Sequence, residues 1–153
     1  MPLNRDYVGR RYPPTEPYHV GREHVRYFAR AIGDANPYCH DPEVARAAGY
    51  PDVIAPPTFL TALSFRRPNE ALADPGLGLD YSRVVHGEQR FVLHRSVVAG
   101  DDLVATPTIT DIRDAGRNEL LTVELDIATT AGEPVATAAQ TIISRGTAAP
   151  KEG

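Results

Sequence analysis

GDANPYCHDPEVARAAGYPDVIAPPTF, residues 33–59, is the stretch with the most specific pattern in this chain. Three polar side chains, those of Asp34, Asn36 and Asp41, lie near its start, and residues of this type form turns and cap helices. A short helix is expected over 42–49, because it opens with proline and ends in glycine. Two consecutive prolines follow and precede an apolar segment. The stretch therefore predicts a polar loop held between helices.

Toward the N-terminus, residues 1–16 are expected to be coil, and residues 18–20 a short strand. An amphipathic helix is predicted over 21–34, with Gly33 as its stop and Arg26 on its outer face. Its apolar stripe has the i, i+3, i+4, i+7 spacing of a helix and consists of Val25, Phe28, Ala29 and Ile32.

Toward the C-terminus, the period of the hydrophobic residues changes to that of strands, which are predicted over 84–98, 103–113, 119–129 and 135–144. Pro107 inside the second of these predicts an edge or a bulge. Helices followed by an antiparallel meander indicate an α+β domain with the helices on one face of a sheet. We therefore expect an N-terminal coil over 1–16, one domain over 17–144 and a flexible tail over 145–153.

Composition excludes several classes of protein. The 153 residues carry 16 basic and 20 acidic side chains, a net charge of −4, which does not suit nucleic-acid binding. Cys39 is the only cysteine, so no internal disulfide and no cysteine-rich metal motif is expected. The first residues hold no apolar run and no segment approaches the ~20 apolar residues of a membrane helix, so a cytoplasmic protein without membrane contact is expected.

The stretch 33–59 resembles the signature of the MaoC-like (R)-specific enoyl-thioester hydratases and dehydratases, which include the FAS1-type dehydratases. Their pattern is Gly-Asp-any-Asn-Pro-any-His-any-Asp, then Ala-Gly-aromatic, then Ile-Ala-His-Gly. Residues 86–101, HGEQRFVLHRSVVAGD, resemble the family's first long strand and turn. The likeness covers about 18–144 and looks closest to HadA/HadC-like accessory subunits of actinobacteria. The matching signature positions are Gly33, Asp34, Asn36, Pro37, Asp41, Ala48, Gly49, Tyr50, Ile54 and Ala55.

The resemblance implies a hot-dog fold, in which a long central helix is wrapped by a curved antiparallel sheet. It implies reversible hydration of a trans-2-enoyl thioester to the (3R)-3-hydroxyacyl thioester, on acyl carrier protein or coenzyme A, in fatty-acid or polyketide metabolism. It implies a hot-dog partner, either identical or different, and no cofactor. In catalytic members an Asp and a His five residues apart activate the water, and the N–H of the Gly in His-Gly polarises the thioester carbonyl.

This sequence departs from that pattern at both parts of the site. Cys39 stands where the His is expected after Asp34, and a thiol is a weak donor with an ordinary pKa of ~8.5. Pro57 stands at the Gly position and has no N–H to donate. We therefore interpret Asp34, Asn36, Cys39 and Pro57 as a degenerate site, expect no catalytic residue, and predict a non-catalytic subunit that shapes the acyl tunnel of its partner.

Two other functions stay open. A self-sufficient homodimeric hydratase would use Asp34 and His40, and an acyl-thioester-binding module would bind without turnover. By the resemblance, Thr58, Phe59 and Phe65 border the acyl tunnel.

Three further groups of residues were weighed. Cys39 beside His40 suggests a nucleophilic dyad, but no third orienting group is evident. A metal site needs three converging ligands, and the spacing offers none. His86, Glu88 and His94 share one face of the first long strand by parity, which suits a solvated or subunit-facing edge better than a pocket.

Overall fold

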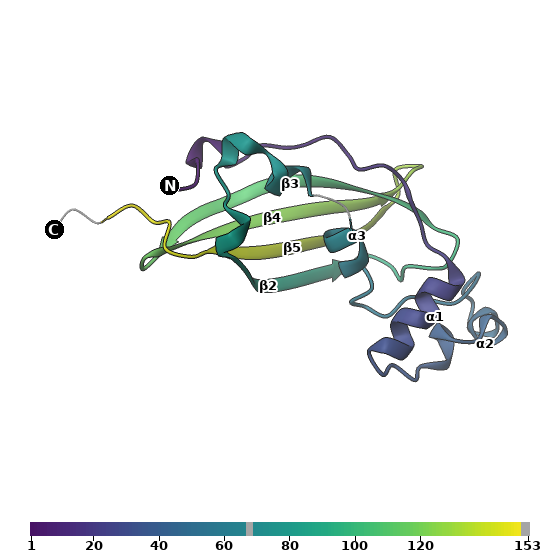
Figure 1. The fold of residues 1–153 in the computed structure, drawn as a ribbon. Coiled ribbons are helices and arrows are strands. Elements are labelled where there is room, and N and C mark those ends of the chain that lie inside the picture. The colour runs from purple at the N-terminus through teal and green to yellow at the C-terminus, as the bar shows by residue number, and fades with distance from the viewer. Residues whose placement is uncertain (67–68, 151–153) are drawn as a thin grey trace.

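A curled antiparallel sheet forms the body of the protein in the computed structural model, which describes residues 1–66 and 69–150 but not the side chains of 65 and 66 (Figure 1). Within these residues the sheet has 5 strands in the order β1-β3-β4-β5-β2. Their bounds are β1 Tyr18–His19, β2 Val84–Leu93, β3 Asp102–Ala115, β4 Asn118–Thr129 and β5 Pro134–Ser144.

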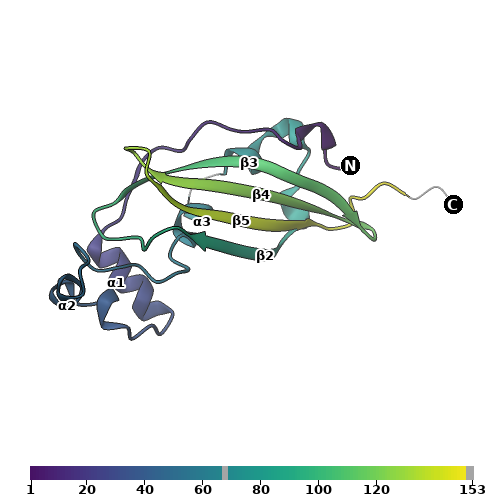
Figure 2. The ribbon, with the colours of Figure 1, turned by 180° about the vertical axis from the view of Figure 1, so that it is seen from behind.

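One face of the sheet is buried beneath helices and the other is open (Figure 2). The alternation along β4 sets this division: Leu121, Val123, Leu125 and Ile127 are buried, and the polar residues between them face outward. The residues that pack on the buried face include Phe59 and Leu60 ahead of α3. The α+β class and the curled antiparallel sheet of the expected hot-dog fold are confirmed.

The helices are short, and the expected long central helix is not formed as such. Their bounds are α1 Arg22–Ala31, α2 Pro42–Ala47, α3 Thr61–Arg66 and α4 Glu70–Ala73, with 3₁₀ turns at η1 Arg5–Tyr7, η2 Pro37–Cys39, η3 Pro75–Leu77 and η4 Tyr81–Arg83. Ahead of α3 the backbone winds in turns, since Phe59 N–H donates to Pro56 O and Ala62 N–H to Phe59 O. Pro68, next but one after the helix, is a residue that a helix seldom continues into.

β2 is an edge strand and is interrupted by a bulge. Among the described residues it pairs with β5 alone, and the register shifts between His86 and Glu88. Gly87 lies at the shift, where a Cβ would come within 3.1 Å of the Ile143 side chain. The predicted common face of His86, Glu88 and His94 is therefore wrong, because one extra residue reverses the parity. The strand also ends at Leu93, earlier than expected.

The N-terminal segment has irregular backbone, yet it lies along the outer edge of β3 (Figure 1). Gly9 N–H donates to Ile109 O at 2.7 Å and Tyr12 N–H to Pro107 O at 2.9 Å. The edge position expected for Pro107 is thus confirmed. Leu3 is buried, and its N–H donates to the buried carboxylate of Glu119 at 2.9 Å.

The segment 145–153, which is expected to be a flexible tail, is fixed by hydrogen bonds at its first residues. Gly146 N–H donates to Asn118 Oδ1 at 3.0 Å, Ala148 N–H donates to Arg117 O at 3.2 Å, and Thr147 is buried. Residues 151–153 lie outside the described residues.

Candidate functional site

The polar loop between α1 and α2 is fixed by local hydrogen bonds. Gly33 adopts a left-handed φ of 73° and ends α1. The Asp34 N–H then donates to Ala29 O at 2.8 Å, which satisfies a carbonyl at the helix end. Asn36 caps the following 3₁₀ turn by accepting from Tyr38 N–H at 3.1 Å. The residues that match the family signature therefore build a defined turn.

His40 contacts Asp34, but it does so at the backbone carbonyl of Asp34 and not at its side chain. His40 Nε2 lies 2.6 Å from the Asp34 carbonyl oxygen. A carbonyl oxygen only accepts, so Nε2 carries a proton, and in the neutral ring Nδ1 is the basic nitrogen. The carboxylate Oδ1 of Asp34 accepts from Asn36 N–H at 2.9 Å instead. In the described chain no hydrogen bond joins the two side chains, so they do not form an aligned acid–base pair.

Arg26 holds the loop from α1. Its Nε donates to the His40 carbonyl oxygen at 2.7 Å, and its side chain is only 28% exposed. Arg26 was expected on the outer face of the helix, and this contact was not predicted. No local pattern signals it, because the two residues lie in different elements.

Cys39 lies on the buried side of the loop. It is 1% exposed, and burial raises the pKa of its thiol to about 11, with the negative charge of Asp34 adding to the rise. A neutral buried thiol neither accepts nor donates a proton readily near neutral pH. No hydrogen bond joins the side chains of Cys39 and His40 in the part of the chain that the structure describes.

Pro57 lies at the start of the turns that lead into α3. It is exposed and has no N–H. The next N–H belongs to Thr58 and makes no hydrogen bond to any described residue. Thr58 instead accepts, through its carbonyl oxygen, from the hydroxyl of Thr61 at 2.8 Å. Within the described residues an N–H without a hydrogen-bond partner therefore exists here, but one residue beyond the position at which the family donor stands.

Of the residues assigned to the acyl tunnel, Thr58 is exposed and Phe59 is fully buried. The Phe59 ring packs edge-on against His24 and Phe28, with centroid distances of 5.0 and 5.4 Å. The side chain of Phe65 lies outside the described residues. The role of these three residues in a tunnel stays a prediction.

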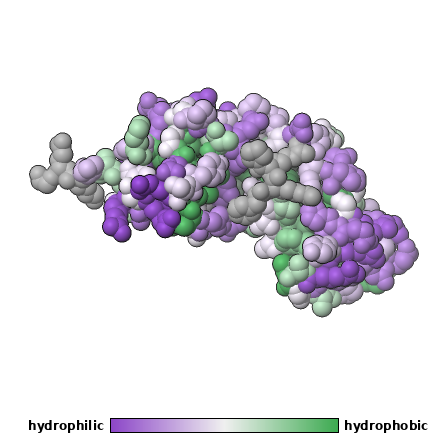
Figure 3. All heavy atoms as spheres, in the orientation of Figure 1, coloured by the Kyte–Doolittle hydropathy of each residue, from purple (hydrophilic) through white to green (hydrophobic). Residues whose placement is uncertain are grey.

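A pocket of about 600 Å³ opens beside the loop and includes both candidate catalytic residues. It does not include Cys39 or Pro57. Figure 3 shows hydrophobic residues along the left margin of the α1–α2 lobe in this view, and hydrophilic residues over most of the rest of that lobe. The pocket is lined by Arg30, Gly33, Asp34, Ala35, Pro37, His40, Asp41 and Val44.

Among the described residues, no three His, Cys, Asp or Glu side chains are grouped so that they would bind a metal ion together. None of the helices in the same part of the chain has the length and apolar character needed to cross a membrane.

Comparison with known proteins identifies the family. Residues 6–138 match the family described as FAS1-like, dehydratase domain region. The chain belongs to this family. The FAS1-like dehydratase match confirms the resemblance seen at residues 33–59, and the polar loop and the curled sheet are its structural counterparts.

Individual relatives and solved structures resemble the chain over most of its length. A UPF0336 protein of Saccharopolyspora erythraea is 54% identical over 153 residues, which cover 100% of this chain and 98% of the relative. A solved structure of a MaoC-like dehydratase has a TM-score of 0.83 and 34% identity over 91% of this chain, which spans only 42% of that longer chain. A chain of the HadBC (3R-hydroxyacyl-ACP dehydratase) complex of Mycobacterium tuberculosis has a TM-score of 0.77 and 32% identity, covering 92% of this chain and 99% of that one.

Proposed function

We propose that this chain is the non-catalytic subunit of a heterodimeric (3R)-3-hydroxyacyl-thioester dehydratase, acting on carrier-protein or coenzyme A thioesters in fatty-acid or polyketide metabolism. The observation that carries the proposal is the state of the loop. The position of the family's histidine holds Cys39, a buried thiol whose pKa is raised to about 11. At the position of the carbonyl-polarising N–H stands Pro57, which has none. Proton transfer and carbonyl polarisation are both impaired.

The partner in this proposal is a second hot-dog subunit that keeps an Asp and a His five residues apart. The free edge of β2 is where we place its sheet. Val85, Val92 and Leu93 on this strand are 39%, 48% and 38% exposed, and the edge leaves backbone N–H and C=O groups unpaired. The HadBC complex among the structural relatives is an assembly of hot-dog dehydratase subunits, which supports a partner of this kind.

The test is the hydration of a trans-2-enoyl-coenzyme A, followed as the loss of absorbance of the enoyl-thioester band. We expect no turnover by the isolated chain, and turnover when it is combined with a hot-dog subunit from a neighbouring reading frame that keeps the Asp and the His. A variant of that partner without its His is the control and should be inactive in the complex. Robust hydration by the isolated chain would overturn the proposal.

Cys39→His and Pro57→Gly separate the two impairments. Each alone should leave the isolated chain inactive, because the first restores a proton shuttle without a donor and the second a donor without a shuttle. Groups that act as a unit are non-additive, so only the double variant is expected to gain activity.

A homodimeric hydratase is the second candidate, and one observation favours it. Asp34 and His40 line the same pocket of about 600 Å³. It requires His40 Nδ1 to act as the base while Nε2 stays bound to the Asp34 carbonyl oxygen. Activity of the isolated chain that is lost in His40→Ala would select this candidate. A pure acyl-binding module would instead bind the thioester without turnover, even with the partner present.

A further inference from the structure

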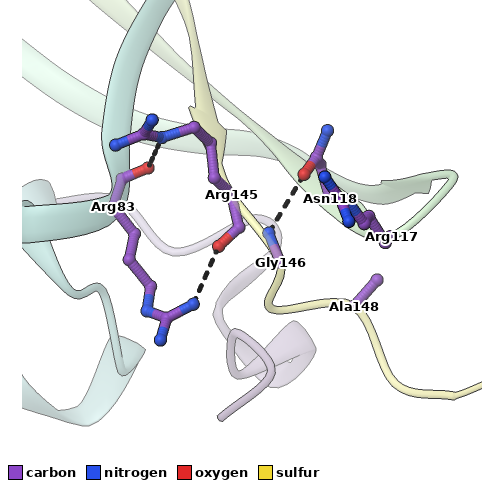
Figure 4. Close-up of a pocket in the computed structure, with 6 residues that line it drawn as sticks. All are labelled: Arg83, Arg117, Asn118, Arg145, Gly146 and Ala148. Carbon is purple, nitrogen blue, oxygen red and sulfur yellow. Dashed lines mark hydrogen bonds between the residues drawn. The ribbon is translucent and has the colours of Figure 1, made fainter.

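A second pocket, of about 660 Å³, lies at the end of the sheet away from α1 and α2 (Figure 4). Three segments that are far apart in the sequence meet there: η4 just before β2, the turn between β3 and β4, and the segment after β5. Each segment contributes an arginine. The lining residues are Arg83, Arg117, Asn118, Arg145, Gly146 and Ala148.

The pocket concentrates positive charge in an acidic protein. Its lining holds three arginines and no carboxylate, whereas the whole chain has a net charge of −4. Arg117 and Arg145 form no salt bridge with any described residue, and the Nε of Arg83 lies 3.4 Å from Asp80 Oδ2. Guanidinium groups stay protonated at any physiological pH. The lining therefore offers an anion positive charge from three separate segments.

Hydrogen bonds to the backbone position the side chains of Arg83 and Arg145 before a ligand arrives. Arg83 Nη1 donates to Arg145 O at 3.4 Å, and Arg145 Nε donates to Arg83 O at 3.2 Å, so the two side chains brace each other's segments (Figure 4). Asn118 lies across the pocket and accepts from Gly146 N–H through Oδ1 at 3.0 Å, which leaves its Nδ2 hydrogens to donate. Preordered donors lower the entropic cost of binding.

We propose that this arginine pocket binds the phosphate group of an organic phosphate ester. Several guanidinium groups around one space suit a phosphate, because each fork donates two parallel hydrogen bonds to its oxygens and the dianion balances more than one charge. The volume falls in the range of ~300–1,000 Å³ that holds small organic ligands, so the site accommodates more than an inorganic ion. It contains none of the residues of the loop that holds Asp34 and His40.

Two ligands could supply such a phosphate. Their selection as candidates rests on the proposed function. Coenzyme A and the phosphopantetheine arm of a carrier protein both carry phosphate groups next to the arm that holds the acyl thioester. The anion site itself does not depend on the dehydratase assignment.

The test is isothermal titration calorimetry of the full chain with coenzyme A, with pantetheine, which lacks phosphate, and with pyrophosphate. We expect coenzyme A to bind, pyrophosphate to compete with it, and pantetheine to bind at least tenfold more weakly. Arg117→Gln, which removes a guanidinium with no salt bridge in the described chain, should weaken coenzyme A binding about tenfold. Arg11→Gln is the matched control: it makes the same charge change at an arginine that pairs with Asp126 outside the pocket, and should leave the affinity unchanged.

Equal affinity for pantetheine and coenzyme A, or coenzyme A binding unaffected by both Arg117→Gln and Arg145→Gln, would overturn the proposal. A carrier protein bearing phosphopantetheine serves as the parallel arm, compared with its form lacking the prosthetic group. If Arg117→Gln weakens binding of the modified carrier alone, the site belongs to the carrier arm. If it weakens binding of coenzyme A, the site belongs to the free thioester. Neither result changes with the outcome of the hydration assay, so the two proposals fail independently.

Discussion

The thiol of Cys39 should react slowly with alkylating reagents while the protein is folded. Its pKa is raised to about 11, mainly by burial and further by the charge of Asp34. At pH 8 a thiol with that pKa is about one part in a thousand thiolate, whereas an unperturbed thiol with a pKa of ~8.5 is about one quarter thiolate. The thiolate is the nucleophile, so ionisation alone slows the reaction by roughly 200-fold, and burial slows it further.

Iodoacetamide labelling at pH 8, followed by mass spectrometry, measures this rate in the folded protein and in urea. Cys39 is the only cysteine, so Cys39→Ser gives the unlabelled baseline. A folded-state rate within tenfold of the rate in urea would refute the reasoning. It would show an accessible, ionised thiol and return the dyad with His40 to consideration.

The same pKa shift makes stability depend on pH. The folded state holds the thiol proton more tightly than the unfolded state, so the contribution is fully present below pH ~8.5 and is lost as pH rises toward 11. The loss approaches ~1.4 kcal/mol per pH unit within that window. Urea unfolding of wild type and of Cys39→Ala between pH 8 and 10.5 measures it. A slope that is unchanged in the alanine variant would assign the effect to another group.

Further changes test other parts of the structure. Asp34→Asn should leave turnover by the heterodimer within about tenfold, and a loss of a thousandfold or more with the fold intact would instead make this carboxylate catalytic. Glu119→Gln, which keeps the acceptor for Leu3 N–H, should be nearly neutral in urea unfolding, whereas Glu119→Ala should cost roughly 2–4 kcal/mol through an orphaned amide and a cavity. Asp74 has a lowered pKa, chiefly because its carboxylate accepts from Gly76 N–H, so its contribution is present above the unfolded pKa and is lost as pH falls through the lower folded value. Thermal unfolding of Asp74→Asn between pH 2.5 and 6 should accordingly lose part of the acid dependence of wild type.

Local sequence patterns correctly predicted the features that depend on interactions between neighbouring residues. The buried positions Val25 and Ala29 of α1, the alternation of β4 and the cap of α2, where Asp41 accepts from Glu43 N–H at 2.9 Å, all follow from neighbouring residues. Ile32, which was expected on the same stripe, lies beyond the end of α1 and is 51% exposed. The signature at residues 33–59 added the fold family, and it also located the two departures at Cys39 and Pro57.

Features that depend on residues far apart in the chain could not be predicted from the sequence. The bulge at Gly87 becomes visible only when β2 is aligned with Ile143 of β5. The contact of Arg26 with the His40 carbonyl and the meeting of the three pocket arginines depend on how the chain returns on itself. Neither the contact nor the arginine cluster is marked by a periodic pattern or a motif in the sequence.

The unequal edges of the sheet limit how this protein associates. At β3 the outer edge is covered by the chain's own N-terminal segment through residues such as Gly9 and Tyr12, whereas the outer edge of β2 pairs with no strand in the part of the chain that the structure describes. A sheet with two free edges adds copies at both ends and grows into a fibre, but a sheet with one free edge is closed by a single neighbour. Strand pairing through β2 would therefore join two subunits and offer no second edge of this kind for a third. Detaching the N-terminal segment would expose the edge of β3 and allow such pairing to continue.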